Sequence, residues 1–358
     1  MSQDDLAGQG SVAAGGDLTN LAGLEPANLM TTATRAEVAC RAALRNYEDT
    51  ENVSIALIEV SENSTFLVIL SDGTKRVMRV HREGYHGYLE IISELQWTAA
   101  LVRDEGIRTP TVVSNRRGEA VTTVSSGEDR VTHCVMFEFA EGEALPPESP
   151  PDAYGKLGAL SAILHRHARE WKIPPGFQRF RWDEEAAFGP NARWGRWDCG
   201  VGVGEEEAAL LRRVQERLLS RLGSFGRGPD RFGLIHADLR FSNLLWSSSG
   251  DITVLDFDDC GWSWFLYDLA AAVSFIEDSP LVPGLIDAWI TGYRSIAPLA
   301  PQDVAETWTF ILMRRLLLLG WIGTHQSAAF ARELGPTFAR GTCDLGERYL
   351  NGELKVSG

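Results

Sequence analysis

Two short apolar segments, Phe232 to Ile235 and Ile252 to Phe257, enclose a polar loop in the second half of this 358-residue chain. The loop reads His-Ala-Asp-Leu-Arg-Phe-Ser-Asn from His236 to Asn243, and Asp256 follows thirteen residues later. Runs of this length and composition predict strands. A rigid strand that ends at His236 would hold Asp238 on the loop. The side chains of Asp238, Asn243 and Asp256 can then face one cavity.

Three oxygen-bearing side chains in this order suit a magnesium-dependent phosphoryl transfer. Carboxylate oxygens and nucleotide phosphates are the ligands that Mg²⁺ usually takes in such sites. Asp256 and Asn243 would hold the metal ion, while Asp238 would orient and deprotonate an acceptor hydroxyl. A polar turn capped by Asp and Asn is the alternative, but the joint match of order and spacing favours the catalytic interpretation.

The first part of the chain is predicted to be rich in strands. Thr34 starts a segment with capping-box spacing that predicts a helix to Tyr47, and Tyr88 to Arg103 has helical spacing as well. Runs rich in Val, Ile and Leu predict an antiparallel meander and then a further pair of strands. These strands are expected at 54–60, 65–70, 74–81, 119–125 and 131–139.

The second part is predicted to be mainly helical. A break rich in Pro, Gly and Glu at 140–152 separates a lobe expected at 34–140 from a larger one at 141–358. Residues 1–33, rich in Gly, Ala, Ser and Thr, are predicted to form a mobile tail. Helices are expected at 151–169, at 205–222 and, broken near three prolines, from Leu266 to the end.

Composition narrows the choice of partners. Asp and Glu total 49 against 34 Lys and Arg, and the net charge of −15 disfavours nucleic acid and anionic membranes as partners. Five scattered cysteines without a C-x-x-C pair indicate neither a disulfide framework nor a zinc site, so a reducing compartment fits best. The most apolar stretch, Thr309 to Gly323, contains two arginines and predicts a core helix rather than a membrane span. The acidic N-terminus does not resemble a signal peptide, and we expect a cytoplasmic protein.

The loop resembles the H-x-D-x-x-x-x-N catalytic loop of the protein-kinase-like superfamily. Ala237 between His and Asp, and the Asp-Phe pair at Asp256, are similar to the aminoglycoside phosphotransferase and choline kinase branch. The stretch from Asp256 to Ala270 looks most like the subgroup that contains homoserine kinase and the RdoA-type kinases. The resemblance implies an α+β, two-lobed protein-kinase-like fold, with a small antiparallel-sheet N-lobe and a larger, mainly helical C-lobe.

The same resemblance implies how ATP is bound. The Gly-poor turn at 61–66 would touch the phosphates through backbone amides and hydroxyls such as that of Ser64, unless it is an ordinary hairpin turn. Arg79, where the family usually has Lys, would meet the α- and β-phosphates, although a solvated strand charge is the alternative. Glu94 on the following helix would pair with Arg79, with Glu90 in reserve.

The hinge between the lobes matches residues 135–140. By position alone, the Glu138 carbonyl and the Ala140 amide would meet the nucleobase, with Phe139 between them.

Four further residues are expected to support the site. His236 would hold the loop without moving protons, and Asp268 would brace it while opening a helix, where it could also act as an N-cap. Asp258 would stand behind the metal or hold a second one. Arg240 would meet an anionic acceptor or the γ-phosphate, and it is a candidate for the acceptor site together with the aromatic stretch 177–197 and Asp259.

These residues predict an enzyme that uses ATP and Mg²⁺ to phosphorylate a hydroxyl of a small molecule, such as an aminoglycoside, an amino alcohol or a similar metabolite. A Ser/Thr protein kinase of the RdoA kind would share the same residues, but the short segment 259–265 leaves no obvious activation loop. A non-catalytic, nucleotide-binding pseudokinase is the third possibility, and only Arg79 and the missing glycines support it.

Overall fold

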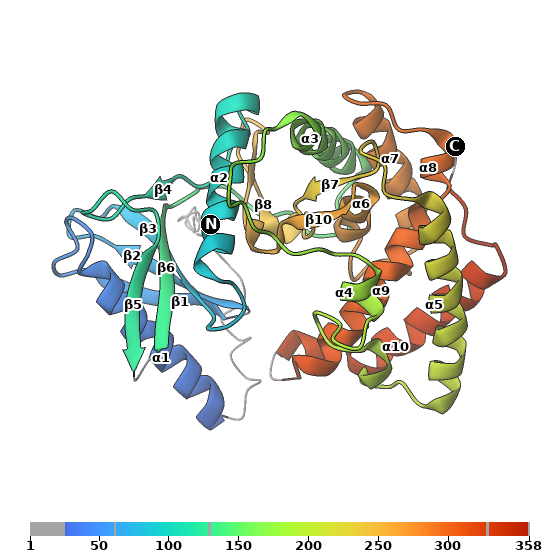
Figure 1. Cartoon of the computed structure of the whole chain (residues 1–358), viewed down its shortest axis with the longest axis horizontal. Coiled ribbons are helices and arrows are strands. Elements are labelled where there is room, and N and C mark those ends of the chain that lie inside the picture. Colours follow the sequence, from blue (N-terminus) through green and yellow to red (C-terminus); the bar gives the residue numbers. More distant parts are fainter. Residues whose placement is uncertain (1–25, 61, 128–129, 327–328, 357–358) are drawn as a thin grey trace, which may run out of the picture.

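The computed structural model describes residues 26–60, 62–127, 130–326 and 329–356. A small lobe built on an antiparallel sheet lies beside a larger, mainly helical lobe (Figure 1). The segment from the end of β6 (Arg130–Glu138) to the start of α3 (Pro151–Glu170) joins the two lobes. This is the α+β arrangement that the sequence predicted.

The N-lobe sheet confirms the predicted meander. Its neighbouring strands are antiparallel, and β6 pairs with β3 on one side and with β4 and β5 on the other. The remaining elements of this lobe are α1 (Pro26–Leu44), β1 (Ser54–Val60), β2 (Asn63–Ile69), β3 (Lys75–His81), α2 (Tyr88–Glu105), β4 (Val112–Val113) and β5 (Thr122–Gly127).

Side chains alternate along β3, so the two faces of the sheet pack against different helices. Met78 and Val80 pack in one apolar cluster with residues of α1. Val77 packs in a second cluster with residues of α2 on the other face. Because successive side chains of a strand point to opposite faces, Arg79 is directed toward α2.

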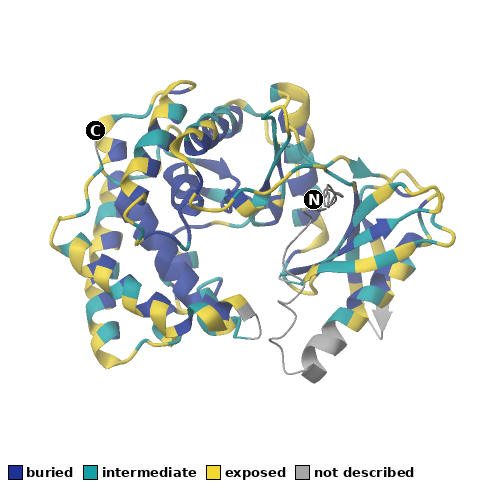
Figure 2. Cartoon of the chain, turned by 180° about the vertical axis from the view of Figure 1, so that it is seen from behind, coloured by how far each residue is buried: buried dark blue, intermediate teal, exposed yellow. Residues whose placement is uncertain are grey.

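The C-lobe surrounds α9 (Thr307–Thr324), which is buried along most of its length, as Figure 2 shows. The apolar stretch of the sequence is therefore a core helix, as expected. In the described part of the chain, no helix is long and apolar enough to cross a membrane. The other helices of this lobe are α4 (Glu184–Phe188), α5 (Glu205–Phe225), α6 (Leu266–Ala272), α7 (Val282–Arg294), α8 (Pro301–Val304) and α10 (Ala329–Leu350).

Two small antiparallel pairs carry the polar loop. β7 (Phe232–Ile235) pairs with β10 (Gly261–Trp264), and β8 (Leu244–Trp246) pairs with β9 (Ile252–Val254). The loop at 236–243 runs from β7 to β8. The segment that holds Asp256 lies between β9 and β10, so both polar segments are anchored at each end by a strand.

Several predicted boundaries were wrong, and three of them have a clear cause or consequence. Helix α1 begins at Pro26 rather than Thr34, since proline is well suited to the first turn of a helix. Residues 26–33 of the expected tail are therefore helical, and residues 1–25 lie outside the described residues. β2 begins at Asn63, so Ser64 is part of a strand and not of the turn. β9 ends at Val254 because Asp256 takes a left-handed backbone conformation, with φ of 55°.

Helices α3 and α7 approach each other through glycines. A Cβ on Gly158 would lie 2.0 Å from the carbonyl oxygen of Trp289, and one on Gly292 would lie 1.8 Å from the carbonyl oxygen of Gly155. The two backbones can be this close only because these positions carry no side chain.

Gly292→Ala is expected to lower the free energy of unfolding by about 2–3 kcal/mol, because the added methyl group overpacks this contact. Gly284→Ala on the same helix is the matched control, since a Cβ there meets nothing within 4 Å. It should be neutral or stabilising by up to about 1 kcal/mol. Urea denaturation measures both variants, and equal losses would contradict the explanation.

Candidate active site

The polar loop is held at its start by Asp268 of α6. Its Oδ1 accepts a hydrogen bond from the Ala237 amide at 2.8 Å, and its Oδ2 accepts from the His236 amide at 3.4 Å and from His165 Nε2 at 2.9 Å. These bonds support the left-handed backbone of Ala237, whose φ is 66°. Asp268 lies within the first turn of α6, and no side chain caps that helix, so its carboxylate braces the loop and is not an N-cap.

His236 connects the loop to the segment that precedes Asp256. Its Nε2 donates to the Leu255 carbonyl at 2.9 Å, and its Nδ1 accepts from the Asp238 amide at 3.3 Å. This pattern requires the neutral ring with its proton on Nε2. Burial lowers the pKa of His236, which agrees with that state. The side chain therefore joins two pieces of backbone, the loop and the segment before Asp256.

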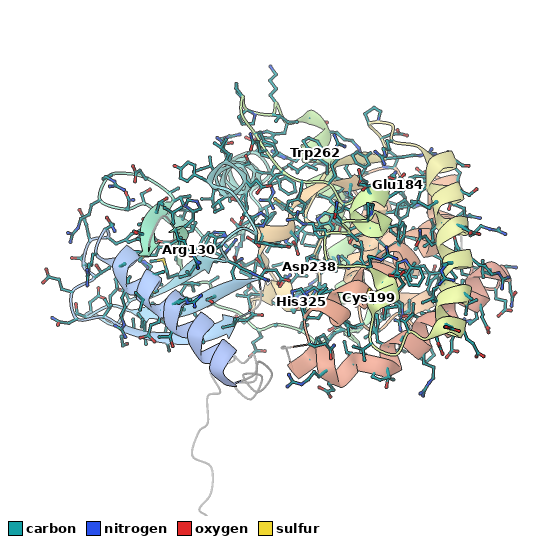
Figure 3. All side chains as sticks on the ribbon, turned by 60° about the horizontal axis from the view of Figure 1, so that its bottom comes forward. Arg130, Glu184, Cys199, Asp238, Trp262 and His325 are labelled. Carbon is teal, nitrogen blue, oxygen red and sulfur yellow. The ribbon has the colours of Figure 1, made fainter. Side chains whose placement is uncertain are left out.

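The carboxylate of Asp238 lies between the two lobes (Figure 3) and is surrounded by donors. Arg240 forms a fork with it, with Nε 2.9 Å from Oδ1 and Nη2 3.0 Å from Oδ2. Asn243 Nδ2 donates to Oδ2 at 2.8 Å, and Arg314 of α9 donates to Oδ1. Burial by itself raises the pKa of Asp238, but Arg240 and Arg314 outweigh it and hold the pKa well below its ordinary value.

Two of these contacts differ from expectation. Arg240, expected at an anionic acceptor or the γ-phosphate, lies on Asp238 in this structure. Arg314 was not among the predicted site residues. The only hint in the sequence was a pair of arginines inside an otherwise apolar stretch.

Asn243 turns back toward Asp238, and this fixes its amide group. Nδ2 also donates to the Asp238 carbonyl at 2.9 Å, while Oδ1 has no hydrogen bond to a described residue. Asp256 keeps an exposed surface although protein surrounds it. Burial raises its pKa well above its ordinary value; Arg79 opposes this rise, and Asp258 and Asp259 add to it. A bound cation would reverse this penalty.

The oxygen donors of Asn243 and Asp256 are of the type that hard divalent cations such as Mg²⁺ accept. Among the described residues, no group of three or more His, Cys, Asp and Glu could hold a metal ion. One carboxylate and one amide oxygen are nevertheless enough for Mg²⁺, because it usually takes its other ligands from phosphates and water.

Arg79 reaches Glu94 across the face of the sheet that α2 covers. Its Nη1 lies 2.8 Å from Glu94 Oε1 and 3.4 Å from Asp258 Oδ1. The two partners of the first pair are 12% and 2% exposed, so the solvated-charge alternative for Arg79 is wrong. Glu90, the reserve partner, instead accepts from the Gly87 amide at 2.8 Å and caps α2.

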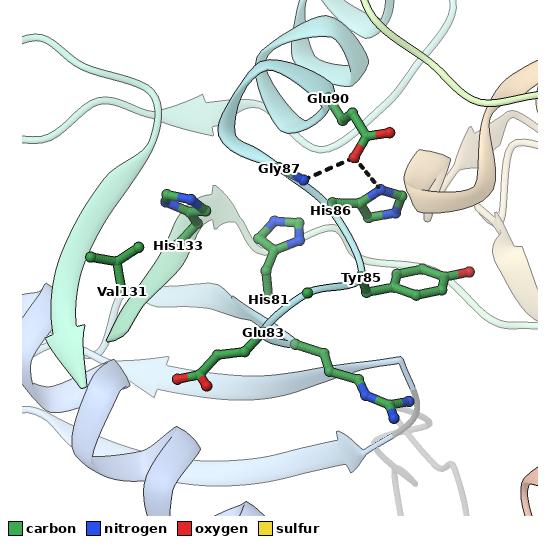
Figure 4. Close-up of a pocket in the computed structure, with 10 residues that line it drawn as sticks. His81, Glu83, Tyr85, His86, Gly87, Glu90, Val131 and His133 are labelled. Atoms are coloured by element: carbon green, nitrogen blue, oxygen red, sulfur yellow. Dashed lines mark hydrogen bonds and ion pairs between the residues drawn. The ribbon is translucent and has the colours of Figure 1, made fainter. Parts of the chain in front are cut away.

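Asp258 joins the lobes through histidines of the N-lobe. Its Oδ2 lies 3.2 Å from His86 Nε2, and His86 Nδ1 lies 3.6 Å from Glu90 Oε2 (Figure 4). Burial favours the neutral ring, but the two carboxylates outweigh it and raise the pKa of His86 to about 9. Asp258 Oδ1 also lies 3.6 Å from His81 Nδ1. Asp258 is thus held by side chains behind the site.

Carboxylates and aromatic side chains meet beside Asp238. Tyr85 donates to Asp259 Oδ1 at 2.9 Å, and Trp182 of the predicted aromatic stretch donates to the Asp259 carbonyl at 2.8 Å. From the turn between β1 and β2, Glu62 Oε1 accepts from Trp321 Nε1 at 3.0 Å. Burial, with Asp238 and Glu62 nearby, raises the pKa of Asp259 to about 7. An organic cation would relieve this crowding of negative charge.

The predicted hinge lies where β6 leaves the sheet. The Glu138 amide donates to the Thr111 carbonyl at 2.8 Å, and Lys75 Nζ lies 5.1 Å from the centre of the Phe139 ring. Ala140 follows at the start of the connection to the C-lobe. Ser64 is buried in β2, so a direct phosphate contact by its hydroxyl is not supported by this position.

Comparison with known proteins agrees with this geometry. Residues 55–299 match the model of the phosphotransferase enzyme family. The chain belongs to that family. Since its motifs, fold and relatives agree, it is a small-molecule kinase whose acceptor is a hydroxyl group.

Three relatives illustrate the similarity. A microcompartment-associated aminopropanol kinase of known structure has 43% sequence identity to this chain. The structures match with a TM-score of 0.82, over 88% of this chain and 98% of that one. The amicoumacin kinase of Bacillus subtilis (strain 168) is 24% identical over 66% of this chain and 69% of its own. An amicoumacin kinase solved with AMP-PNP and Ca²⁺ shares the fold at 20% identity, with a TM-score of 0.70 and coverage of 89% and 96%.

His86 predicts a pH dependence of stability. Because its pKa rises from 6.5 to about 9 on folding, its contribution is complete below pH 6.5 and is lost as the pH rises toward 9. From pH 6.5 to pH 9, the free energy of unfolding of the wild type should therefore fall by about 1–3 kcal/mol more than that of His86→Gln. Urea denaturation at pH 6 and pH 9 measures this, and parallel pH curves for the two proteins would contradict it.

Proposed function

We propose that the protein transfers the γ-phosphate of ATP, together with Mg²⁺, to the hydroxyl of a small amino alcohol in the cytoplasm. The observation that carries the choice of acceptor is the pairing of Asp259 and Glu62 with aromatic side chains next to Asp238. The 43% identity to an aminopropanol kinase supports the same choice.

The acceptor would bind with its charged end among the carboxylates. Asp259 and Glu62 attract an ammonium group, and the rings of Tyr85 and Trp321 can lie against its apolar carbons. The hydroxyl of a two- or three-carbon amino alcohol would then lie near Asp238. A neutral diol of the same size lacks the charge and would gain little from these carboxylates.

Transfer itself depends on position more than on a strong base. Asp238 orients the hydroxyl and takes its proton as the new O–P bond forms and the bond from the γ-phosphorus to the ADP oxygen breaks. The lowered pKa of Asp238 makes it a weak base, which suits a loose phosphoryl-transfer transition state in which the proton leaves late.

The nucleotide would lie between the lobes. Arg79, held by Glu94, would contact its α- and β-phosphates, and Glu138, Phe139 and Ala140 would border its base. Asn243 Oδ1 and Asp256 would hold Mg²⁺, which when bound neutralises charge on the phosphates. We assign Ser64 no more than a backbone contribution to this site.

Motif likeness supports placing the protein near homoserine kinase and the RdoA-type kinases within its family. A Ser/Thr protein kinase of the RdoA kind would use the same catalytic residues, so the acceptor must be measured. A pseudokinase is disfavoured because Asp238, Asn243 and Asp256 are all retained.

Asp238→Asn is expected to reduce kcat by about 10²–10⁴-fold, because it removes the group that receives the hydroxyl proton. Binding of ATP and Mg²⁺, measured by calorimetry, should change little. Turnover equal to that of wild type would refute the assignment of Asp238.

The acceptor is tested with γ-labelled ATP, Mg²⁺ and paired compounds. We expect kcat/KM for 1-amino-2-propanol to exceed that for 1,2-propanediol by about 10²-fold or more, as a charge-assisted contact implies. Glu62→Gln should reduce this preference, while Glu48→Gln, an exposed N-lobe change, should not.

Two other results would change the proposal. Label found only in an added protein substrate would favour the RdoA-type function. Normal ATP binding without label in any acceptor would favour the pseudokinase.

A further inference from the structure

We infer that Arg314 of α9 is a positioning residue for phosphoryl transfer, which acts by holding the carboxylate of Asp238 toward the acceptor hydroxyl. The inference rests on the proposed role of Asp238 as the group that receives the proton. It adds to the site a residue 76 positions away in sequence.

Arg314 carries its charge into a buried, largely apolar part of the protein, where only a specific partner can stabilise it. Its side chain is 1% exposed, inside a helix whose surroundings are otherwise largely apolar. Burial of an unpaired guanidinium is strongly unfavourable, and removal of one partner from a buried ion pair is usually damaging. The carboxylate that balances this charge is that of Asp238.

The guanidinium of Arg314 is itself fixed by the loop, by α6 and by Ser274, which follows α6. Nε donates to Ser274 Oγ at 2.7 Å, and Nη1 donates to the Ala237 carbonyl at 2.7 Å and to Tyr267 Oη at 3.3 Å. Nη2 is thereby aimed at Asp238 Oδ1. A rigid donor on a packed helix holds its acceptor more firmly than a donor on the surface.

The two arginines on Asp238 differ in this respect. Arg240 is 31% exposed and covers both carboxylate oxygens from the solvent side. An acceptor hydroxyl would reach the carboxylate once Arg240 moves away, which its partly exposed side chain allows. Arg314 and Asn243 then each keep one oxygen in place and leave the other lone pairs free.

Arg315 provides a matched control on the same helix. It is 2% exposed, donates to Thr342 Oγ1 at 3.0 Å and pairs with the buried Glu277. Among the described residues it makes no hydrogen bond or ion pair with the loop at 236–243, and its guanidinium lies over the ring of Phe338. Arg314→Lys and Arg315→Lys are therefore the same change at two equally buried sites, of which only one touches Asp238.

Steady-state kinetics and thermal unfolding of the two variants test the inference. Arg314→Lys should lower kcat by about 10–100-fold, the loss that a small misplacement of a reacting group produces, with KM for ATP within about twofold. Arg315→Lys should lose a similar amount of thermal stability but keep kcat within about twofold. Ser274→Ala, which removes one support of Arg314 and leaves its charge, is the milder second variant and should lower kcat by about 2–10-fold.

Coupling to Asp238 separates positioning from a general loss of structure. Because Arg314 acts through Asp238, Arg314→Lys should change the residual turnover of Asp238→Asn by less than about twofold. The inference is wrong if Arg314→Lys and Arg315→Lys lower kcat equally, or if both Arg314→Lys and Ser274→Ala leave kcat unchanged. Full turnover of Asp238→Asn alone would instead overturn the proposed function on which the inference rests.

Discussion

The hydrogen bonds from Asp268 to the backbone of the loop determine where the rest of the site can lie. Ala237 has a left-handed backbone, which an alanine adopts only when its surroundings hold it there. With Ala237 fixed, Asp238 projects between the lobes and its own amide meets His236. His236 then holds the Leu255 carbonyl, so the position of one polar segment is passed on to the segment that carries Asp256. One buried carboxylate thus organises both halves of the proposed machinery.

The N-lobe meets this machinery through a side chain whose direction is set by strand alternation. Arg79 lies on the α2 face because Met78 and Val80 occupy the other face. Asp258, which comes from the C-lobe, then completes a small network with Arg79 and His86. Since each lobe supplies part of this network, the position of Arg79 relative to the polar loop depends on the packing of both.

Local pattern in the sequence was enough to predict the meander, the core helix and the polar loop, because these depend on periodicity or on short spacing along the chain. The pairing of Arg79 with Glu94 was expected only from the resemblance to the kinase-like family, and the structure places the two side chains in contact. The ion pair of Arg314 with Asp238 could not be predicted, because it joins residues brought together only by the packing of α9. Likewise, β9 was predicted too long because an apolar run gives no sign of the left-handed backbone at Asp256. The helical start at Pro26 was missed because the composition there suggests a tail.

The two neighbouring arginines of α9 also bear on how the C-lobe folds. Each is buried, and each needs a carboxylate from a distant part of the chain, Asp238 for one and Glu277 for the other. Helix α9 cannot enter the core with these charges unpaired. Docking of α9 and ordering of the loop should therefore be coupled during folding. The amides of the loop should then be among the slowest to exchange, an unusual property for a segment outside helices and strands.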